Sequence, residues 1–455
     1  MKELKIGFIG VNSNLLNGEQ NIKIFENSIK LLTEIVKPHQ LVYFKEVLVD
    51  TPESQEKLTK LIEEWDEIKF DLIIIQSVGF GLGIGPVEIV ISQRNVPIVL
   101  WALPEPDLKE GIGLKRNSWC GVNMHSAHLN KLGVRYEYIY GLPGQEVELK
   151  LKQIIKVFEV IKKLRKSTIG AVGARVPGYY DSNFDELSLR KALGIKFEFF
   201  DLAQVFAAFE KISDKEVEDT AKKIYSFKRV NIDDYIKNST KFYISIKKII
   251  AEYNLSAISV KCWPDLQNML NIVACSVVSA LGDLNIPVSC EGDMLGAASM
   301  LLMRYFNNDV TSLVDITDFD FKENSFLIFH CGACPTAMAA KRDRIEHREQ
   351  SIAATHSGIA NEFALKSGNC ALLRLREDND IRGKYKMFFA GGEGIEGANI
   401  IRGNTLKIKI KSDLGNFIDT IIKNGFEHHY SFGYGVKKDM LMKFCEWANI
   451  ETYFV

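Results

Sequence analysis

The strongest constraint on the fold is a regular alternation of strand-like and helix-like segments through the first 165 residues. Residues 70–76, FDLIIIQ, form an almost continuous apolar run, which is typical of a strand buried on both faces of a parallel sheet. Residues 96–102 form another such run, and a charged amphipathic segment lies at 52–68. Repeated β-α-β units with short connections predict a parallel sheet with helices on both faces.

A second α/β region begins at residue 167 and continues to about residue 320, with helix-like and strand-like segments again in alternation. Beyond about residue 322 the strand-like segments are short and interrupted by Gly, Asn and Asp, which indicates an antiparallel sheet and a small barrel. We therefore expect an α/β protein with two parallel-sheet domains, at 1–166 and 167–321, followed by a β-rich, barrel-like C-terminal domain at 322–455.

Composition and charge exclude several classes of protein. The 57 basic and 58 acidic side chains give a net charge of −1, so no overall positive field would attract nucleic acid or an anionic membrane. The most apolar stretches are far shorter than the roughly 20 residues that span a bilayer. The apolar run near the N-terminus is typical of a first strand rather than a signal peptide. We expect a cytoplasmic protein whose eight cysteines are free thiols.

Two acidic segments are candidates for chemistry. Residues 286–293, IPVSCEGD, place Glu291 and Asp293 directly after a short strand-like run. Sites in parallel α/β sheets lie beyond the carboxyl ends of the strands, which favours Glu291 as a site residue. The alternative is that Asp293 caps the following helix and Glu291 is a solvated neighbour. Asp315 lies within an apolar run, where a carboxylate needs a cation or hydrogen bonds.

Three histidines accompany these acids. His330 ends a strand-like run and precedes Cys331 and Cys334. No second ligand pair for a zinc site is evident, which leaves a thiol–disulfide pair, or a site histidine beside cysteines that pack as small apolar residues. His428 and His429 are adjacent, and neighbouring residues of a strand face opposite sides, so at most one should face a given site.

Lys261 and Trp263 follow a strand-like segment at 257–260. A cation and an aromatic ring at the carboxyl end of a strand suit a polar ligand such as a sugar. The alternative is an indole that packs beside the first turn of a helix, with Pro264 near the first helical position.

The motifs resemble those of the L-fucose/L-arabinose isomerase superfamily, in particular its fucose-isomerase-like branch. KCWPDLQ, CEGDMLGAASMLLM, DITDFD, FHCGACP and GFEHHY occur in this order through residues 261–430. VLWALPEP at 99–106 and NSWCGVNMHSAHLNKLG at 117–133 extend the resemblance into the N-terminal half. The resemblance implies two Rossmann-like domains and a β-rich domain, and an enzyme that interconverts an aldose and its ketose with Mn²⁺ or Mg²⁺.

Residue by residue, the resemblance implies that Glu291, Asp315 and His429 bind the metal, and His330 resembles a further metal or substrate ligand. Oxygen and imidazole ligands suit these ions, which would stabilise the enediolate of an open-chain sugar. Glu291 and Asp315 are then the natural pair to move a proton between C1 and C2. The candidate substrate contacts are Trp101, Lys261, Trp263 and His428.

The resemblance further implies a homo-oligomer, a trimer or hexamer, in which a neighbouring N-terminal domain completes each site. It leaves open whether the substrate is a deoxyhexose, a pentose or a modified hexose. Glu427 would add a negative charge if it faced the site. The alternative function is a non-catalytic carbohydrate-binding or sensing protein on the same scaffold, which would bind sugar without turnover.

Overall fold

The computed structural model describes residues 4–16, 18–106, 108–111, 113–350, 358–378, 380–395 and 400–455. The chain forms two compact units, residues 1–162 and 163–455. Among the described residues, no helix has both the length and the apolar character that a membrane span requires.

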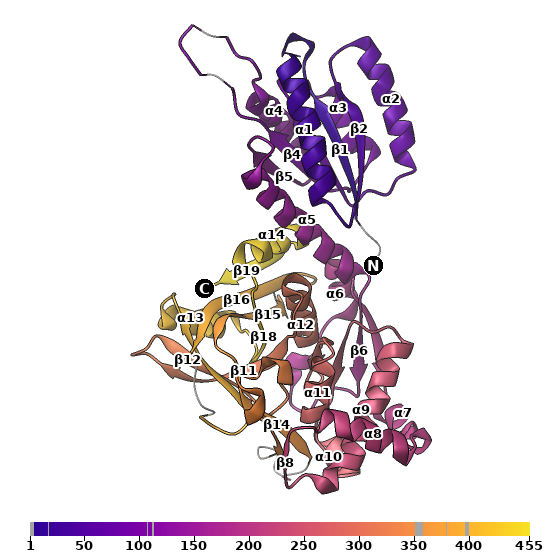
Figure 1. Ribbon diagram of the computed structural model, residues 1–455, viewed down its shortest axis with the longest axis vertical. Coiled ribbons are helices and arrows are strands. Elements are labelled where there is room, and N and C mark those ends of the chain that lie inside the picture. Colours follow the sequence, from indigo (N-terminus) through magenta and orange to yellow (C-terminus); the bar gives the residue numbers. More distant parts are fainter. Residues whose placement is uncertain are drawn as a thin grey trace. The chain divides into compact units, whose positions relative to one another are not determined.

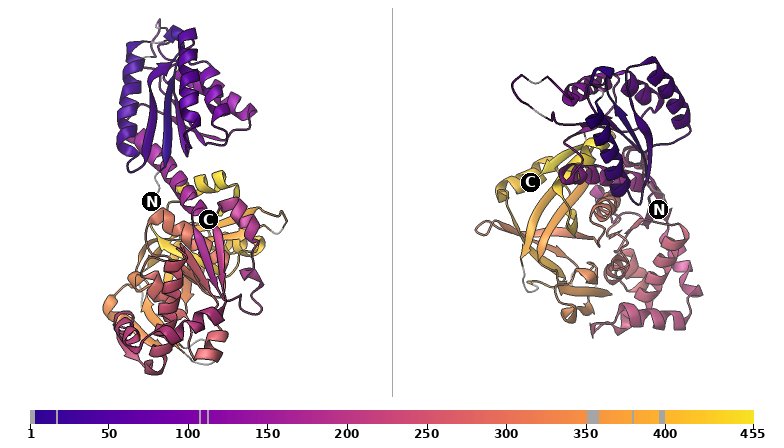
Figure 2. Two further views of the ribbon diagram at one scale, coloured as in Figure 1. Left: turned by 90° about the vertical axis from the view of Figure 1, so that its right-hand side faces the viewer. Right: turned by 45° about the horizontal axis from the view of Figure 1, so that its top comes forward.

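The N-terminal unit is built around a five-stranded parallel sheet with the order β2-β1-β3-β4-β5. Its strands are β1 (Lys5–Val11), β2 (Gln40–Leu48), β3 (Leu72–Ser77), β4 (Ile98–Ala102) and β5 (Tyr136–Tyr140). Its helices are α1 (Glu19–Ile35), α2 (Pro52–Asp66), α3 (Ile84–Ser92), α4 (Ser118–Lys131) and most of α5 (Gln145–Arg165), and they flank the sheet on both faces (Figure 2). Every residue of β3 and β4 is buried, which explains their continuous apolar sequence.

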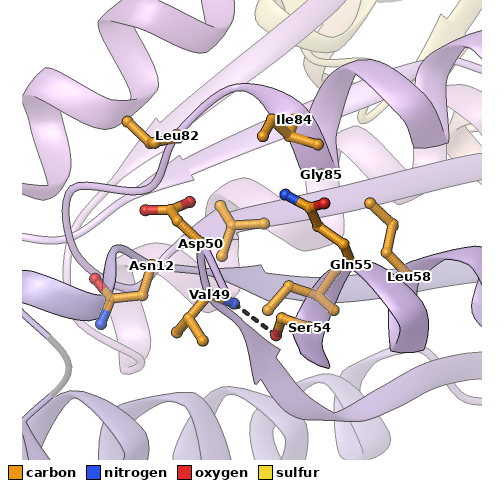
Figure 3. A pocket seen from close by; sticks show the side chains of 11 residues that line it. Asn12, Val49, Asp50, Ser54, Gln55, Leu58, Leu82, Ile84 and Gly85 are labelled. Atoms are coloured by element: carbon orange, nitrogen blue, oxygen red, sulfur yellow. Dashed lines mark hydrogen bonds between the residues drawn. The ribbon is translucent and has the colours of Figure 1, made fainter. Parts of the chain in front are cut away.

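A small polar pocket lies at the carboxyl ends of β1 and β2 in this unit (Figure 3). Asn12, Asp50 and Gln55 line it, and the Val49 N–H donates a hydrogen bond to Ser54 Oγ over 3.1 Å. Burial raises the pKa of Asp50. The free space, about 20 Å³, is enough for one water molecule but not for a sugar.

The second unit contains a four-stranded parallel sheet with the order β10-β9-β6-β7. Its strands are β6 (Thr168–Val172), β7 (Lys196–Phe200), β9 (Ala257–Val260) and β10 (Val288–Ser289), and its helices are α6 (Glu186–Leu193), α7 (Leu202–Ala207), α8 (Asp214–Ile224), α9 (Asp233–Glu252), α10 (Asp265–Leu270), α11 (Cys275–Gly282) and α12 (Met294–Asn307). The segment that follows β9 forms two helices because Asn271, at φ +55°, ends α10 in the left-handed conformation.

The remainder of this unit is a ten-stranded mixed sheet with the order β19-β16-β15-β18-β11-β12-β17-β14-β13-β8. β16 also pairs with β17, so six antiparallel strands, from β16 through β15, β18, β11 and β12 to β17, close into a barrel. The strands are β8 (Lys228–Val230), β11 (Ser312–Asp320), β12 (Ser325–His330), β13 (Glu346–Glu349), β14 (Ile359–Ala364), β15 (Gly368–Glu377), β16 (Tyr385–Ile395), β17 (Asn404–Ile410), β18 (His429–Tyr434) and β19 (Ile450–Phe454). α13 (Leu414–Asn424) and α14 (Lys438–Ala448) complete the chain.

The predicted fold class, two parallel-sheet regions followed by a strand-rich region, is confirmed. β8 and β11 come from the stretch 167–321, which is predicted to form the second parallel-sheet domain, yet both pair in the C-terminal sheet. α12 lies between the two sheets and contacts β9 and β10 on one side and β15 and β18 on the other (Figure 1). The start of α12 therefore lies where the two sheets meet.

Candidate active site

Three predicted site residues converge beside the start of α12. Glu291 follows β10, Asp315 lies in β11, and His429 begins β18, where it pairs directly with Asp315 in the antiparallel register. Glu291 has a φ of +63° and Gly292 a φ of +76°, so the chain turns sharply between β10 and α12. A left-handed conformation is uncommon for a residue with a long side chain and is frequent at functional sites.

The His429 ring lies close to both carboxylates. His429 Nε2 is 3.2 Å from Glu291 Oε2 and 3.9 Å from Asp315 Oδ1. Asp315 Oδ1 is buried and has no hydrogen-bond partner among the described residues. A buried carboxylate oxygen without a hydrogen bond is costly, so a donor group, a water molecule or a cation beside Asp315 Oδ1 would stabilise it.

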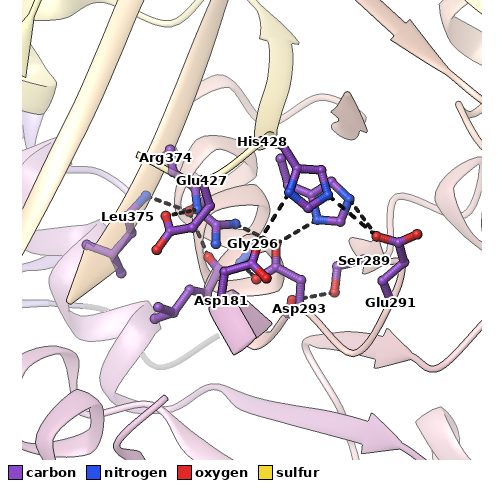
Figure 4. A network of polar contacts seen from close by, with 12 residues as sticks. Asp181, Ser289, Glu291, Asp293, Gly296, Arg374, Leu375, Glu427 and His428 are labelled. Atoms are coloured by element: carbon purple, nitrogen blue, oxygen red, sulfur yellow. Dashed lines mark hydrogen bonds and ion pairs between the residues drawn. The ribbon is translucent and has the colours of Figure 1, made fainter. Parts of the chain in front are cut away.

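Asp293 fixes the orientation of the His429 ring. Its Oδ2 lies 3.0 Å from His429 Nδ1, and its Oδ1 accepts the N–H of Gly296 at the first turn of α12 over 2.7 Å (Figure 4). Arg374 donates to the same carboxylate. The contact at Nδ1 holds the ring so that Nε2 faces Glu291 and Asp315, as a carboxylate behind a metal-binding histidine does. The predicted capping role of Asp293 is confirmed, and the same carboxylate also contacts His429 and Arg374.

Neighbouring charges control the protonation of this cluster. Burial alone would lower the pKa of His429, but hydrogen bonds to Asp293 and Glu291 and the negative charges of Asp293 and Asp315 outweigh it and raise the pKa to about 10. Burial would raise the pKa of Glu291, but hydrogen bonds from His428 and His429 hold it well below its ordinary value. Without an ion the site therefore pairs an imidazolium with a carboxylate, and a metal ion would replace the proton on Nε2.

Glu427 does not add an uncompensated charge to the site. Its Oε2 accepts the Nε–H of Arg374 over 3.1 Å, and its Oε1 lies 3.8 Å from Arg376 Nε. The Arg374 side chain is 1% exposed and bridges Glu427 to Asp293. This buried arrangement ties β15 to α12 and to the residues just before β18 (Figure 4).

Both adjacent histidines reach Glu291, so the expectation that only one would face the site is wrong. His428 precedes the first residue of β18, and the alternation of strand side chains does not apply to it. Its Nε2 lies 3.6 Å from Glu291 Oε2 and its Nδ1 lies 3.2 Å from Asp181 Oδ2 (Figure 4). The ligand atoms of Glu291, His428 and His429 lie within 4.8 Å of one another.

Aromatic side chains surround Glu291. Trp263 Nε1 donates to Glu291 Oε1 over 2.9 Å, and the Trp263 ring packs edge-on against Tyr179 with the centroids 5.9 Å apart. Burial, together with the charge of Glu291 and a hydrogen bond to it, raises the pKa of Tyr179 to about 12. The Lys261 ammonium is paired with Asp265, and its side chain is 14% exposed.

Comparison with known proteins agrees with this geometry. Residues 7–165 match the family model of the fucose/sulfoquinovose isomerase N-terminal domain. A sulfoquinovose isomerase from Alkalicoccus urumqiensis is 28% identical over 370 residues, 79% of this chain and 81% of the relative. One from Priestia aryabhattai is 27% identical over 88% of this chain and 89% of the relative. One from Clostridium sp. (strain MSTE9) is 24% identical over 99% of both.

These matches agree with the resemblance of the motifs to the L-fucose/L-arabinose isomerase superfamily. The relatives that align with most of the chain support an aldose–ketose isomerase. The structure adds Tyr179, Asp181, Asp293 and Arg374 to the residues that the motifs single out around Glu291. Asp293 is the one with a sequence signal, because it stands two residues after Glu291 in the same motif. The others are distant in sequence.

His330 lies near Asp315 and His429. Its Nδ1 accepts the N–H of Cys331 over 2.9 Å, and its Nε2 is buried with no hydrogen-bond partner in the described part of the chain. Burial would lower its pKa, but the charges of Cys331 and Asp315 raise it. The ring is thus held in place with one nitrogen unused.

Two sequence interpretations need correction. Trp101 is 0% exposed in the core of the N-terminal unit, and its Nε1–H donates to the Gly141 carbonyl, so it offers no surface to a sugar. Cys331 and Cys334 do not face each other as a redox pair would. Cys331 Sγ lies 3.4 Å from Cys275 Sγ, whereas Cys334 accepts the hydroxyl of Ser312.

Proposed function

We propose that this protein is a metal-dependent isomerase that interconverts sulfoquinovose, a glucose derivative with a sulfonate at C6, and the corresponding ketose. The observation that supports the metal is the unpartnered, buried Oδ1 of Asp315 beside the Glu291–His429 pair. Support for the substrate comes from relatives named sulfoquinovose isomerase that align with 79% to 99% of this chain.

The donor set fits Mn²⁺ or Mg²⁺. Glu291, Asp315 and His429 would hold the ion, and carboxylate and imidazole are ligands that suit these metals. Metal–ligand bonds of about 2.0–2.2 Å place the ligand atoms of one ion about 3–4 Å apart. The separations of 3.2 and 3.9 Å from His429 Nε2 agree with that spacing. His428 and His330 are additional candidate ligands.

The bound ion would supply Lewis-acid stabilisation of the charge that develops on the sugar oxygens. The protein would supply the proton transfer. Glu291 and Asp315 are the carboxylates that would move the proton between C1 and C2 of the open-chain sugar. The low pKa of Glu291 keeps it ionised at neutral pH. Trp263, through its hydrogen bond to Glu291 Oε1, would orient that carboxylate.

Turnover of sulfoquinovose by the Mn²⁺-loaded protein in D₂O tests this proposal. Proton transfer by a carboxylate exchanges with solvent, so NMR should show deuterium at C2 or C1 of recovered sugar. Glu291→Gln and Asp315→Asn should each lower kcat by about 100-fold or more. Asp318→Asn is the matched control, because Asp318 is an exposed acid on the same strand, and it should retain full activity. No turnover with either metal, or full activity of Glu291→Gln, would contradict the proposal.

The superfamily resemblance also supports a cytoplasmic homo-oligomer, a trimer or hexamer. Sedimentation velocity of the purified protein tests the assembly. A non-catalytic sugar-binding role would require binding of sulfoquinovose with no metal dependence and no turnover, and the same NMR assay distinguishes it.

A further inference from the structure

We propose that Arg175 binds the sulfonate of the substrate and thereby sets the preference of the enzyme for a sulfonated over a neutral sugar. This inference rests on the proposed function. It depends on the connection between β6 and α6, residues 173–185, which is placed against the candidate metal ligands.

The β6–α6 connection is in direct contact with the site. The backbone of Arg175 lies so close to Gly292 that a Cβ at Gly292 would be 2.8 Å from Arg175 Cα. Further along the same connection, Tyr179 packs against the His428 ring with the centroids 5.6 Å apart. Asp181 is ion-paired with His428. A sugar held at Glu291 would therefore lie beside this segment.

The other cations around the site already have carboxylate partners. Arg374 is paired with Asp293 and Glu427, and Lys261 is paired with Asp265. Arg175, in contrast, has no carboxylate within ion-pair distance among the residues that the structure describes. Its charge is thus available for a ligand.

The guanidinium of Arg175 is held in place by neutral groups. Its Nε–H donates to Asn183 Oδ1 over 3.1 Å, its Nη1 donates to the Val176 carbonyl over 3.4 Å, and its Cζ lies 5.0 Å from the centroid of the Tyr180 ring. Among the residues that the structure describes, no hydrogen bond engages Nη2 of Arg175. A planar guanidinium held in this way can offer parallel hydrogen bonds to an oxyanion such as a sulfonate.

The site carries several carboxylates, so a sulfonated sugar would need a cation near its sulfonate. Glu291, Asp293 and Asp315 gather around His429, and Asp181 lies on the other side of His428. A sulfonate carries a permanent negative charge and would be repelled by uncompensated carboxylates. The metal would offset the carboxylates at the C1–C2 end of the sugar, and Arg175 would offset the charge at C6.

The experiment compares wild type with Arg175→Gln and Arg175→Lys on sulfoquinovose and on 6-deoxyglucose, which lacks the sulfonate. Loss of a hydrogen bond to a charged group predicts a 10- to 150-fold fall in kcat/KM for sulfoquinovose in Arg175→Gln, mainly through KM. Activity on 6-deoxyglucose and Mn²⁺ affinity should change by less than about threefold. Arg175→Lys keeps the positive charge but lacks the paired N–H donors of a guanidinium. Its kcat/KM for sulfoquinovose should therefore lie between that of Arg175→Gln and that of wild type.

Arg190→Gln is the matched control, because Arg190 is an exposed arginine on α6, and it should behave as wild type. If wild type is active, an unchanged KM for sulfoquinovose in Arg175→Gln would overturn the role of Arg175 but not the proposed function. Equal losses in Arg175→Gln on both sugars and in Mn²⁺ affinity would assign Arg175 a structural role and also overturn it. A wild type that isomerises no sugar would instead refute the proposed function.

Discussion

Asp293 shows how one side chain can serve the helix, the charge network and the site together. It accepts the N–H of Gly296 at the start of α12, pairs with the buried Arg374, and holds Nδ1 of His429. The first contact is local and follows from helix capping. The other two contacts join groups that lie 81 and 136 residues away in the chain.

Asp293→Asn should weaken the site without removing a metal ligand. The amide keeps the shape but removes the charge behind His429, and loss of such a supporting carboxylate costs about 10- to 100-fold in metal affinity. Calorimetric titration with Mn²⁺ measures it. Asp413→Asn is the control, because Asp413 caps the exposed start of α13 and should change only local stability. Wild-type affinity in Asp293→Asn would show that the Asp293–His429 contact does not support the metal.

At the scale of elements, the side chains of α13 divide into those that pack against the barrel and those that face solvent. α13 is amphipathic, with Phe417 fully buried against the barrel and Ile422 73% exposed. Phe417 stacks on Phe326 of β12 with the centroids 4.8 Å apart, and meets Phe388 of β16 edge-on. One face of α13 thus completes the barrel core.

Phe417→Ala should destabilise the second unit by about 3–5 kcal/mol, because it leaves a cavity between two aromatic neighbours. Ile422→Ala on the same helix should change the free energy of unfolding by less than about 0.5 kcal/mol. Urea unfolding of the full-length variants, followed by circular dichroism, measures both. Equal effects of the two substitutions would contradict the packing described for α13.

The middle of α4 and the end of β3, with the loop that follows it, form an acid-sensitive contact in the N-terminal unit. His125 is fully buried between Ser77 Oγ, 3.1 Å from Nδ1, and the Gly81 carbonyl, 3.0 Å from Nε2. Burial lowers its pKa to about 4, so the folded unit holds the neutral ring. The unfolded chain, with a pKa of about 6.5, binds the proton first as the pH falls.

The stability of this unit should therefore decrease as the pH falls from about 6.5 to 4, by up to about 3 kcal/mol. His125→Gln should be less stable at neutral pH but should lose this component of the pH dependence. Urea unfolding at pH 7.5 and 5.0, followed by hydrogen exchange of the segments in the unit 1–162, measures the difference. An identical pH dependence in wild type and variant would show that His125 does not cause it.

At the scale of the whole molecule, all the proposed metal ligands belong to the unit 163–455. A ligand that binds only the folded form at 100 times its Kd stabilises it by about 2.7 kcal/mol. Saturating Mn²⁺ should therefore slow hydrogen exchange around residues 288–300, 312–320 and 428–434, and EDTA should reverse this effect. Mass spectrometry measures the exchange of each segment. Protection confined to the unit 1–162 would place the ion elsewhere.

The sequence alone predicted the architecture and most of the candidate ligands. Continuous apolar runs such as residues 70–76 identify buried parallel strands, because a strand covered on both faces has no polar positions. Glu291, Asp315 and His429 stand in motifs whose order resembles one superfamily. The apolar pattern of residues 96–102 did not exclude Trp101 as a substrate contact. The sequence of a strand does not show whether an indole is buried in the core or lines a site.

What only the tertiary structure decided is which distant groups meet. Four residues approach the site from segments more than 50 residues away from Glu291 and His429 in the chain: Tyr179, Asp181, Arg175 and Arg374. Local patterns report the burial and period of one segment, whereas a salt bridge or an unpartnered oxygen is a property of several segments packed together. The sequence by itself therefore determined the fold class and the family resemblance, and the packing of α12 between two sheets determined which charges meet at the site.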